Sequence, residues 1–371
     1  MWKIVVSLKP HKWRVLVLGA EFDRAEVPLY RAASRKGKTT LLKTLLSSQC
    51  RMDCKYCAFR AGCRIFPREK WSIDELVRIT IELYNKSIIS GLFLSSSMFG
   101  DPDRVVEEEV EVAEKLREKG FRGYIHLRLM PGVSRYLVER AGRVADRIGI
   151  NIETIEPNLF SEIAPSKGDW IQDIIKRLEW CVNTWRALRN EMRGIKTGYL
   201  RAGVDTQIIV GVMDETDYEI LRTTYYLYRS LGLRRVYFSA FTPIATTPYE
   251  ARKPAPLWRE YRLYQASELI RNYGFTLNDI ESILENGMLM NRDPKIVYAE
   301  RNKDLYPIDL ENTDMNLLLK VPGIGPRTAR KIIKLRNVKR KLSVDDLIKI
   351  LGYRRYKKVA RYILLKNKKL L

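Results

Sequence analysis

The stretch Leu41-Leu-Lys-Thr-Leu-Leu-Ser-Ser-Gln-Cys50-Arg-Met-Asp-Cys54-Lys-Tyr56-Cys57 joins an apolar run to three closely spaced cysteines. The run 41–48 has the length and composition of a buried β-strand. The cysteines follow it with the spacing C-x3-C-x2-C. Five cysteines placed at random would give this spacing only about once in a thousand such chains. The sequence therefore predicts a strand that ends in a group of thiols.

Strand-like and helix-like segments alternate along the rest of the first 275 residues. Further strands are expected at 91–96, 123–129, 148–154, 206–212 and 235–241. Helices are expected at 72–85, which begins with the capping box Ser72-Ile-Asp-Glu75, and at 103–119, 134–141, 170–193, 217–231 and 256–272. Six strand–helix repeats predict an α/β fold with a parallel sheet, either a barrel or a doubly wound sheet. In both folds the chemistry lies at the carboxyl ends of the strands, where the cysteines follow.

Length and composition narrow the class of protein. A chain of 371 residues that is 46% hydrophobic is expected to be globular, with about two domains. No apolar run reaches the roughly 18 residues that cross a membrane, and the N-terminus does not resemble a signal peptide. We therefore expect a cytoplasmic protein with no membrane partner. In that compartment clustered cysteines indicate metal or redox chemistry rather than disulfides. Because His11 and His126 are the two histidines, a metal site would rely on sulfur.

Positive charge is concentrated near the C-terminus. The net charge is +23, and residues 320–371 carry 18 Lys and Arg against two acids, which gives +16. Such a concentration of charge indicates a polyanionic partner, most readily nucleic acid. The alternative is a solvated basic surface without a partner.

A second motif lies inside this basic segment. The residues Val321-Pro-Gly323-Ile324-Gly325-Pro-Arg327-Thr-Ala-Arg330-Lys331-Ile332 resemble a helix-hairpin-helix, a module that grips the nucleic-acid backbone. Two glycines permit a tight turn whose backbone N–H groups can approach a phosphate, and the next helix adds its dipole. The predicted nucleic-acid contacts are Gly323, Ile324, Gly325, Arg327, Arg330 and Lys331. A degenerate second copy follows over 342–364, and a hairpin that binds protein is the alternative.

The three thiols alone are compatible with two kinds of metal centre. A tetrahedral zinc ion needs four ligands, and Cys63 could supply a fourth thiolate. Three thiolates can instead hold three irons of a four-iron cluster, which leaves the fourth iron open to a small molecule. For Cys63 a role near the cluster or none is expected, and Cys181 lies in an apolar helical pattern typical of core.

The stretch from Cys50 to Cys57 resembles the signature of the radical S-adenosylmethionine (radical SAM) superfamily, and the six repeats match its partial (β/α)6 barrel. The resemblance implies that Cys50, Cys54 and Cys57 bind a 4Fe-4S cluster whose open iron chelates the amine and carboxylate of SAM. An electron from a donor such as ferredoxin or flavodoxin then cleaves SAM into methionine and a 5′-deoxyadenosyl radical. That radical abstracts hydrogen from a substrate carbon.

The same resemblance implies which residues bind SAM. The aromatic residue before the third cysteine matches a position whose backbone contacts the adenine. Three serines replace the Gly-Glu motif expected after the second strand, so only hydroxyls and carbonyls carry over there, and an ordinary turn is the alternative. Polar residues end the fourth strand, and a glycine that could equally mark a bulge ends the fifth. The implied residues are Tyr56, Ser95, Ser96, Ser97, Asn151, Glu153 and Gly211.

Between barrel and hairpin lie short motifs that include Arg262, Tyr264 and Lys295. Together with the cysteines and the hairpin, these motifs resemble a radical SAM branch assigned to DNA modification or repair. Genes of that branch accompany a uracil-DNA-glycosylase-like protein, which is an expected partner. The three residues are expected either to line a path for substrate or to pack between domains.

These observations predict four segments: an extension of unknown role (1–37), a radical SAM partial barrel (38–275), a linking segment (276–312) and a helix-hairpin-helix domain (313–371). The predicted function is a radical SAM enzyme that acts on DNA. One alternative is the same chemistry on structured RNA. Another is a nucleic-acid-binding protein with a structural or redox-sensing cluster, as in base-excision glycosylases. Those proteins place four cysteines after the hairpin on an all-helical fold, whereas here three precede it by more than 260 residues.

Overall fold

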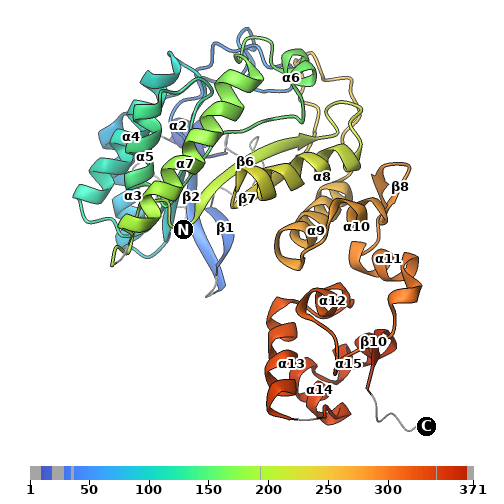
Figure 1. Cartoon of the computed structure of the whole chain (residues 1–371). Coiled ribbons are helices and arrows are strands. Elements are labelled where there is room, and N and C mark those ends of the chain that lie inside the picture. The colour runs from blue at the N-terminus through green and yellow to red at the C-terminus, as the bar shows by residue number, and fades with distance from the viewer. Residues whose placement is uncertain (1–9, 19–28, 35–36, 193, 340, 366–371) are drawn as a thin grey trace. The chain divides into compact units, whose positions relative to one another are not determined.

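The chain divides into two compact units in the computed structural model, which describes residues 10–18, 29–34, 37–192, 194–339 and 341–365 (Figure 1). Unit 1 contains Met1–Asp214 and Leu227–Ala255, and unit 2 contains Glu215–Tyr226 and Pro256–Leu371. Unit 2 thus includes the last helix of the segment predicted as barrel, so the division at residues 275 and 312 stays a prediction. Within the described residues, no helix has the length and apolar character needed to cross a membrane.

Unit 1 is built on one sheet, in which six parallel strands pair in sequence order and one antiparallel strand is added at the edge. The strands are β1 (Leu29–Ser34), β2 (Gly37–Leu45), β3 (Gly91–Ser95), β4 (Tyr124–Arg128), β5 (Arg147–Gly149), β6 (Gly203–Val210) and β7 (Arg235–Ala240). A doubly wound sheet reverses its strand order at a switch point, whereas this order runs in one direction as in a barrel wall. Because β1 and β7 stand at opposite ends of the sheet, the barrel is partial, which confirms the predicted fold class.

Amphipathic helices pack next to one another along the outside of this sheet (Figure 1). They are α3 (Ile73–Asn85), α4 (Pro102–Glu118), α5 (Arg135–Val144) and α7 (Lys176–Glu191), with the π-helical turns η3 (Trp170–Ile175) and η4 (Leu227–Leu231). Ser72 caps α3 as predicted, by accepting from Glu75 N at 3.3 Å. The Glu75 carboxylate pairs with Lys12 instead of closing the box. The elements that were not predicted include the edge strand β1 and the short helix α6 (Pro157–Ile163).

Part of the N-terminal extension packs on this barrel. The short helix α2 (Pro10–Trp13) packs on the π-helical turn η1 (Arg14–Leu18), and η1 lies against β2 with Leu16 and Val17 buried. Lys12 lies over the ring of Trp71, 4.9 Å from its centre. The described part of this extension therefore contributes to the core of unit 1, and residues 1–9, 19–28 and 35–36 of it lie outside the described residues.

The interior of the partial barrel contains a buried group of charges. Asp205 on β6 is fully buried and lies 2.5 Å from Arg128 Nη1 and 2.9 Å from His126 Nε2. Arg147 Nη1 is 3.6 Å from the same carboxylate. These groups hold the pKa of Asp205 below its ordinary value although burial alone would raise it. The charges thus tie β4, β5 and β6 together from the inside.

Unit 2 is mostly helical. It contains α8 (Asp217–Tyr226), α9 (Leu257–Tyr273), α10 (Leu277–Glu281), α11 (Pro294–Arg301), α12 (Met315–Lys320), α13 (Pro326–Val338), α14 (Val344–Leu351) and α15 (Tyr353–Val359), and the 3-10 turns η5 (Lys303–Leu305) and η6 (Ala360–Tyr362). Its strand pairs are β8 (Leu284–Glu285) with β9 (Met288–Leu289), and β10 (Ile308–Asp309) with β11 (Ile363–Leu364). Apolar residues between Ile308 and Leu365 form one buried cluster.

Candidate functional site

A cavity of about 600 Å³ opens in unit 1 at the carboxyl ends of the strands. Cys50, Cys54 and Cys57 all line it, together with residues that follow β3, β4 and β7. Its volume lies in the range of pockets that enclose a small molecule or cofactor. The sheet therefore brings the three cysteines of the motif to the place where barrel enzymes carry their chemistry.

Neighbouring segments hold the cysteine loop in a fixed conformation. Three hydrogen bonds join Asp53 and Ser166: Asp53 N donates to Ser166 Oγ at 3.0 Å, and Ser166 donates to Asp53 Oδ1 from its Oγ at 2.6 Å and from its backbone N at 3.1 Å. Arg68 donates to the carbonyls of Ser48 at 2.9 Å and Cys63 at 2.8 Å. These bonds fix the loop that carries the three thiols.

The thiols sit in different degrees of burial. Cys54 is 6% exposed, while Cys50 and Cys57 are partly exposed. Burial raises the pKa of Cys54 to about 11 and that of Cys57 to about 12, and the nearby Lys167 ammonium opposes both shifts. Thiols buried in this way stay protonated until a bound cation displaces the proton.

The three thiols line one cavity, and across the described residues no three His, Cys, Asp or Glu side chains are grouped as ligands of one metal ion. Thiolates that share a zinc ion all lie about 2.3 Å from it, whereas in a four-iron cluster each thiolate binds a different iron.

A buried ion pair lies beside the cysteines. Glu153 is 3% exposed, and Lys167 Nζ approaches its carboxylate to 2.5 Å. Burial, followed by the Glu153 carboxylate, raises the pKa of Tyr56, so that phenol stays protonated and bonded to Glu153. Glu153 has a positive φ of 60°, which turns the chain between its bridge to β6 and the next loop. Two of the residues that the resemblance implied for SAM binding, Tyr56 and Glu153, thus line the cavity. Lys167, which was not predicted, lines it as well.

The predicted serines and Asn151 also line the cavity, but they differ in which hydrogen-bonding atoms they can present to a ligand. Ser97 Oγ is engaged with the carbonyls of Ser47 at 2.9 Å and Gln49 at 2.7 Å, and it thereby fixes the start of the cysteine loop. Ser96 Oγ donates to Ser97 O at 3.0 Å, and Ser95 is 9% exposed. The buried Oδ1 of Asn151 has no hydrogen-bond partner in the described residues, which leaves an acceptor for a ligand.

Other predicted or considered residues lie away from the cavity wall. Gly211 has a φ of 74° after β6 and is not among the lining residues. Cys63 is buried, with its Sγ 3.5 Å from Thr246 Oγ1, and Cys181 is buried on α7. Sequence reasoning missed Lys167 and Arg128, which do line the cavity. Neither stands in a motif, and only the fold brings them there.

In unit 2 the predicted hairpin is a tight turn between α12 and α13. Gly323 has a φ of 87°, and a Cβ there would lie 2.8 Å from Val359 Cγ2, so only glycine fits. Ile324 is buried, and Gly325 begins α13 as an N-cap without a capping side chain. A second turn at Gly352, with a φ of 76°, joins α14 to α15 and is open to solvent. The degenerate copy therefore also forms a helical hairpin.

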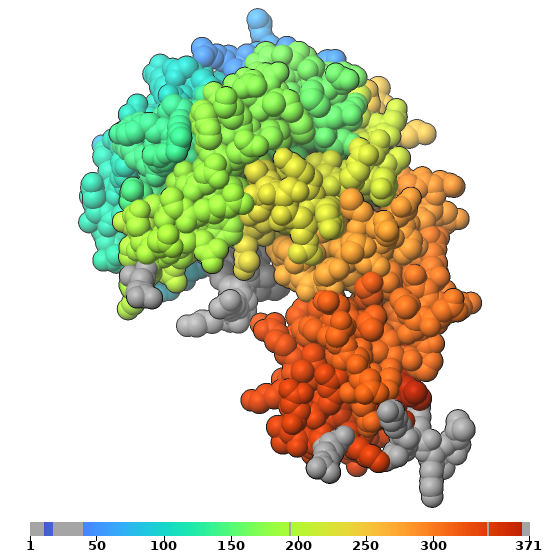
Figure 2. Space-filling view, in the orientation of Figure 1, coloured from blue at the N-terminus to red at the C-terminus, as the bar shows by residue number. Residues whose placement is uncertain are grey.

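Both turns are surrounded by exposed cations. After the first turn these are Arg327, Arg330 and Lys331, and after the second they are Arg354, Arg355, Lys357 and Lys358. Arg330 Nε bonds back to Pro326 O at 3.1 Å. The C-terminal helices that carry these residues form the red surface in Figure 2. This unit thus presents uncapped helix starts within a strongly basic surface.

Of the linking residues, one reaches the hairpin. Lys295 is 8% exposed and donates from Nζ to the carbonyl of Ile324 at 2.5 Å. Arg262 bonds instead to Gln265 at 2.7 Å and to Asn291 at 3.3 Å. Tyr264 lies on α9 and is partly buried. Lys295 therefore packs within unit 2, and a substrate path along these residues stays a prediction.

Comparison with known proteins concerns the fold. No protein-family model matches the sequence, and no curated protein matches it. The FeFe-hydrogenase maturase HydG from Carboxydothermus hydrogenoformans aligns with a TM-score of 0.50 and 13% identity, over 87% of this chain and 76% of that one. Another crystal structure of HydG aligns with a TM-score of 0.49 and 12% identity, over 86% of this chain and 80% of that one. Methylornithine synthase (PylB) aligns with a TM-score of 0.45 and 18% identity, over 63% of this chain and 62% of that one.

Proposed function

We propose that this chain is a radical SAM enzyme that modifies or repairs DNA, with a 4Fe-4S cluster held by Cys50, Cys54 and Cys57. The observation that carries the proposal is that these cysteines, at the spacing C-x3-C-x2-C, line one cavity at the strand ends of a partial barrel. A zinc site is less well supported, because Cys63 does not line that cavity.

When bound, the cluster would supply the electron that cleaves S-adenosylmethionine. The residues of the chain would bind and orient the S-adenosylmethionine. Asn151 offers an unpartnered acceptor to a hydroxyl of the ligand. Lys167 and Glu153 neutralise each other beside the thiols, so a ligand carboxylate can compete for the Lys167 ammonium. Apolar residues of the cavity wall exclude water from a reactive species; they include Leu129, Met130, Ile209 and Phe241.

The proposal of a DNA substrate rests on unit 2. Two helical hairpins with glycine turns present uncapped N-terminal N–H groups among exposed arginines and lysines. Helix starts of this kind bind phosphates, and such contacts position a protein on a backbone without reading its sequence. We propose a donor such as ferredoxin or flavodoxin as the source of the electron.

The decisive experiment is anaerobic incubation of the reconstituted protein with SAM, a reductant and duplex DNA carrying deuterium in its nucleotides. Formation of 5′-deoxyadenosine tests the radical chemistry, and deuterium in that product, detected by mass spectrometry, tests DNA as the substrate. Cys54→Ala is the matched control. SAM cleavage without deuterium transfer from DNA, but with transfer from structured RNA, would move the proposal to RNA. No cleavage by an iron-loaded protein would refute the enzyme class.

A further inference from the structure

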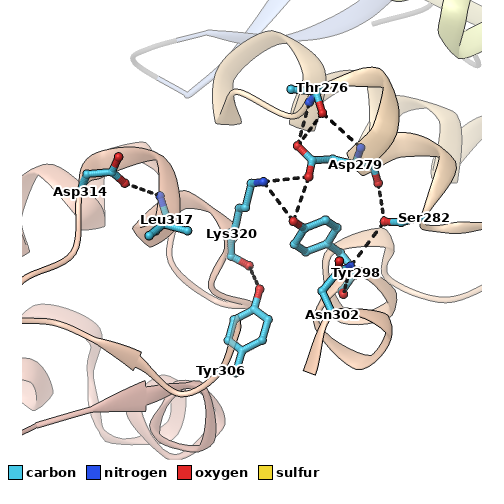
Figure 3. Close-up of polar contacts among 9 residues, drawn as sticks. All are labelled: Thr276, Asp279, Ser282, Tyr298, Asn302, Tyr306, Asp314, Leu317 and Lys320. Atoms are coloured by element: carbon cyan, nitrogen blue, oxygen red, sulfur yellow. Dashed lines mark hydrogen bonds and ion pairs between the residues drawn. The ribbon is translucent and has the colours of Figure 1, made fainter. Parts of the chain in front are cut away.

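Lys320 and Lys295 both bond to the first hairpin of unit 2 or to the residues around it, and the environments of their ammonium groups differ. Lys320 ends α12, and its Nζ lies 2.8 Å from Asp279 Oδ1 and 3.0 Å from the Tyr298 hydroxyl (Figure 3). The Tyr306 hydroxyl donates to the Lys320 carbonyl at 2.8 Å. The charge of Lys320 is thus paired with a carboxylate, and its contacts anchor the hairpin to the linking helices.

Lys295 has no such partner. Its Nζ donates to the carbonyl of Ile324 and lies 4.6 Å from the centre of the Tyr273 ring. In the described residues no carboxylate lies within ion-pair distance of this Nζ; Asp293, which caps α11, acts on it only through space. A buried ammonium bonded to one carbonyl is an expensive arrangement unless a further negative charge is nearby for part of the time.

The geometry of one peptide unit indicates where that charge would sit. The peptide between Ile324 and Gly325 is trans, so its C=O and N–H point in opposite directions. Because Lys295 binds the carbonyl, the Gly325 N–H points away from the ammonium. No hydrogen bond joins that N–H to another described residue. A donor polarised from behind by an ammonium binds an anion more strongly than an ordinary amide.

We propose that Lys295 is a positioning residue for phosphate binding: its ammonium orients and polarises the Ile324–Gly325 peptide toward a backbone phosphate, and phosphate binding takes up a proton at Lys295. This inference rests on the proposed grip of DNA by the hairpin. It adds a regulation of that site, since the strength of the grip then depends on pH in the neutral range.

The charges around Lys295 determine the sign of this dependence. Burial lowers the pKa of Lys295 to about 7, and Asp293 opposes the shift. Tyr273 also faces it, with its ring centre 4.6 Å from the ammonium, and burial raises the pKa of that phenol. Carboxylates, phenols and guanidinium groups do not change charge between pH 6 and 9. The histidines and cysteines of the chain all lie in unit 1.

Both forms of Lys295 can donate to the carbonyl, but only the ammonium form attracts a phosphate. DNA affinity is therefore expected to be highest below pH 7 and to fall as the pH rises through the pKa of the free protein. If a bound phosphate raises that pKa by one unit, the total loss is about tenfold. A purely structural lysine would give no such profile, because the hydrogen bond persists in both forms.

The test uses the full chain and a fluorescein-labelled duplex of about 20 base pairs, a length that spans roughly two helical turns. Fluorescence anisotropy measures its affinity from pH 6 to 9 at constant ionic strength. The wild type should lose about tenfold across this range. Lys295→Met should bind weakly and with the same affinity at every pH, at or below the affinity of the wild type at pH 9, while Lys295→Arg should keep close to the wild-type affinity at pH 6 throughout. Arg292→Gln removes an exposed charge of the same segment and should keep the wild-type profile.

A second measurement needs no variant. Calorimetric titration of the wild type with the duplex at pH 7.5, in buffers of different ionisation enthalpy, counts the protons taken up. Uptake of a fraction of one proton per chain supports the inference. If DNA binds without proton uptake, or if the affinity of Lys295→Met changes with pH in parallel with the wild type, the proposed role of Lys295 is overturned. The proposal that the hairpin binds DNA would not be affected by that result. Absence of binding at every pH refutes the DNA grip itself, and with it this inference.

Discussion

Replacing Arg327 and Lys331 together by glutamine tests whether the hairpin grips phosphates through defined cations. Both side chains are exposed and lie within the first two turns of α13, which begins at the Gly325 turn. The change removes two charges and leaves both glycine turns intact. That is a cleaner perturbation than a bulkier residue at Gly323, which would displace Val359 with or without DNA.

The expected magnitude follows from counterion release. If the two hairpins neutralise about four phosphates, the logarithm of affinity falls against the logarithm of salt with a slope of about −3.6. Between 50 and 200 mM salt the wild type should then lose roughly 150-fold in affinity. With two phosphates left, the slope becomes about −1.8, and the loss over the same range is roughly 12-fold.

Fluorescence anisotropy with duplexes of several unrelated sequences measures these slopes. All sequences should respond alike, because phosphate contacts carry no base information. The matched control is Arg292→Gln with Lys303→Gln, which removes two exposed charges from the linking segment and should leave the slope nearly unchanged. If the control reduced the salt slope as much as the hairpin variant, or if the hairpin variant did not reduce it, binding through defined cations of the hairpin would be refuted. Diffuse electrostatic attraction would then be the remaining explanation for DNA binding.

Four further predictions concern the metal site, the barrel interior, on which there are two, and the link. Alanine at any one of the three signature cysteines should abolish binding of about four irons per chain and SAM cleavage, whereas Cys63→Ala should keep both; zinc in the native protein would contradict this. Asp205→Asn removes the carboxylate that faces the buried cations and should cost about 3–5 kcal/mol, or roughly 6–20 °C in thermal melting at 2–4 °C per kcal/mol; a shift below that range argues against the charge group. Burial lowers the pKa of His126 to about 4, so the unfolded chain binds more protons between pH 4 and its ordinary value; denaturant titrations should find stability rising with pH there, by at most about 1.4 kcal/mol per unit. A chain ending at Asn312 should still cleave SAM slowly but lose protection from proteolysis around Ile308, whose apolar contacts come from residues beyond the cut.

Local pattern was sufficient to predict the architecture of the barrel. The six parallel strands and the helices that follow them overlap the ranges that periodicity and capping predicted, although β5 is only the three residues Arg147–Gly149. Periodicity could not decide between a barrel and a doubly wound sheet, since that choice depends on strand order. It also missed α6, which has seven residues, and the antiparallel edge strand β1.

The candidate site could be predicted only where spacing along the chain encodes it. The cysteines and Tyr56 are close in sequence, so a motif reveals them. Lys167 faces Glu153 because the loop after α6 is held to the cysteine loop by Asp53 and Ser166, which are 113 residues apart. No local pattern marks a lysine whose partner depends on such a closure.

Lys295 illustrates the same limit in unit 2, with a consequence for how the hairpin works. A charge count over 320–371 places the basic surface in the C-terminal segment alone. Yet the turn of the hairpin is bonded from behind by Lys295, and the end of α12 by Asp279 and Tyr298, which all precede that segment. Since the peptide that would face a phosphate is bonded to a residue of the linking helices, the proposed grip would be a property of unit 2 as a whole. Cutting the chain between linking segment and hairpin should therefore weaken DNA binding by the hairpin even though every exposed cation is kept.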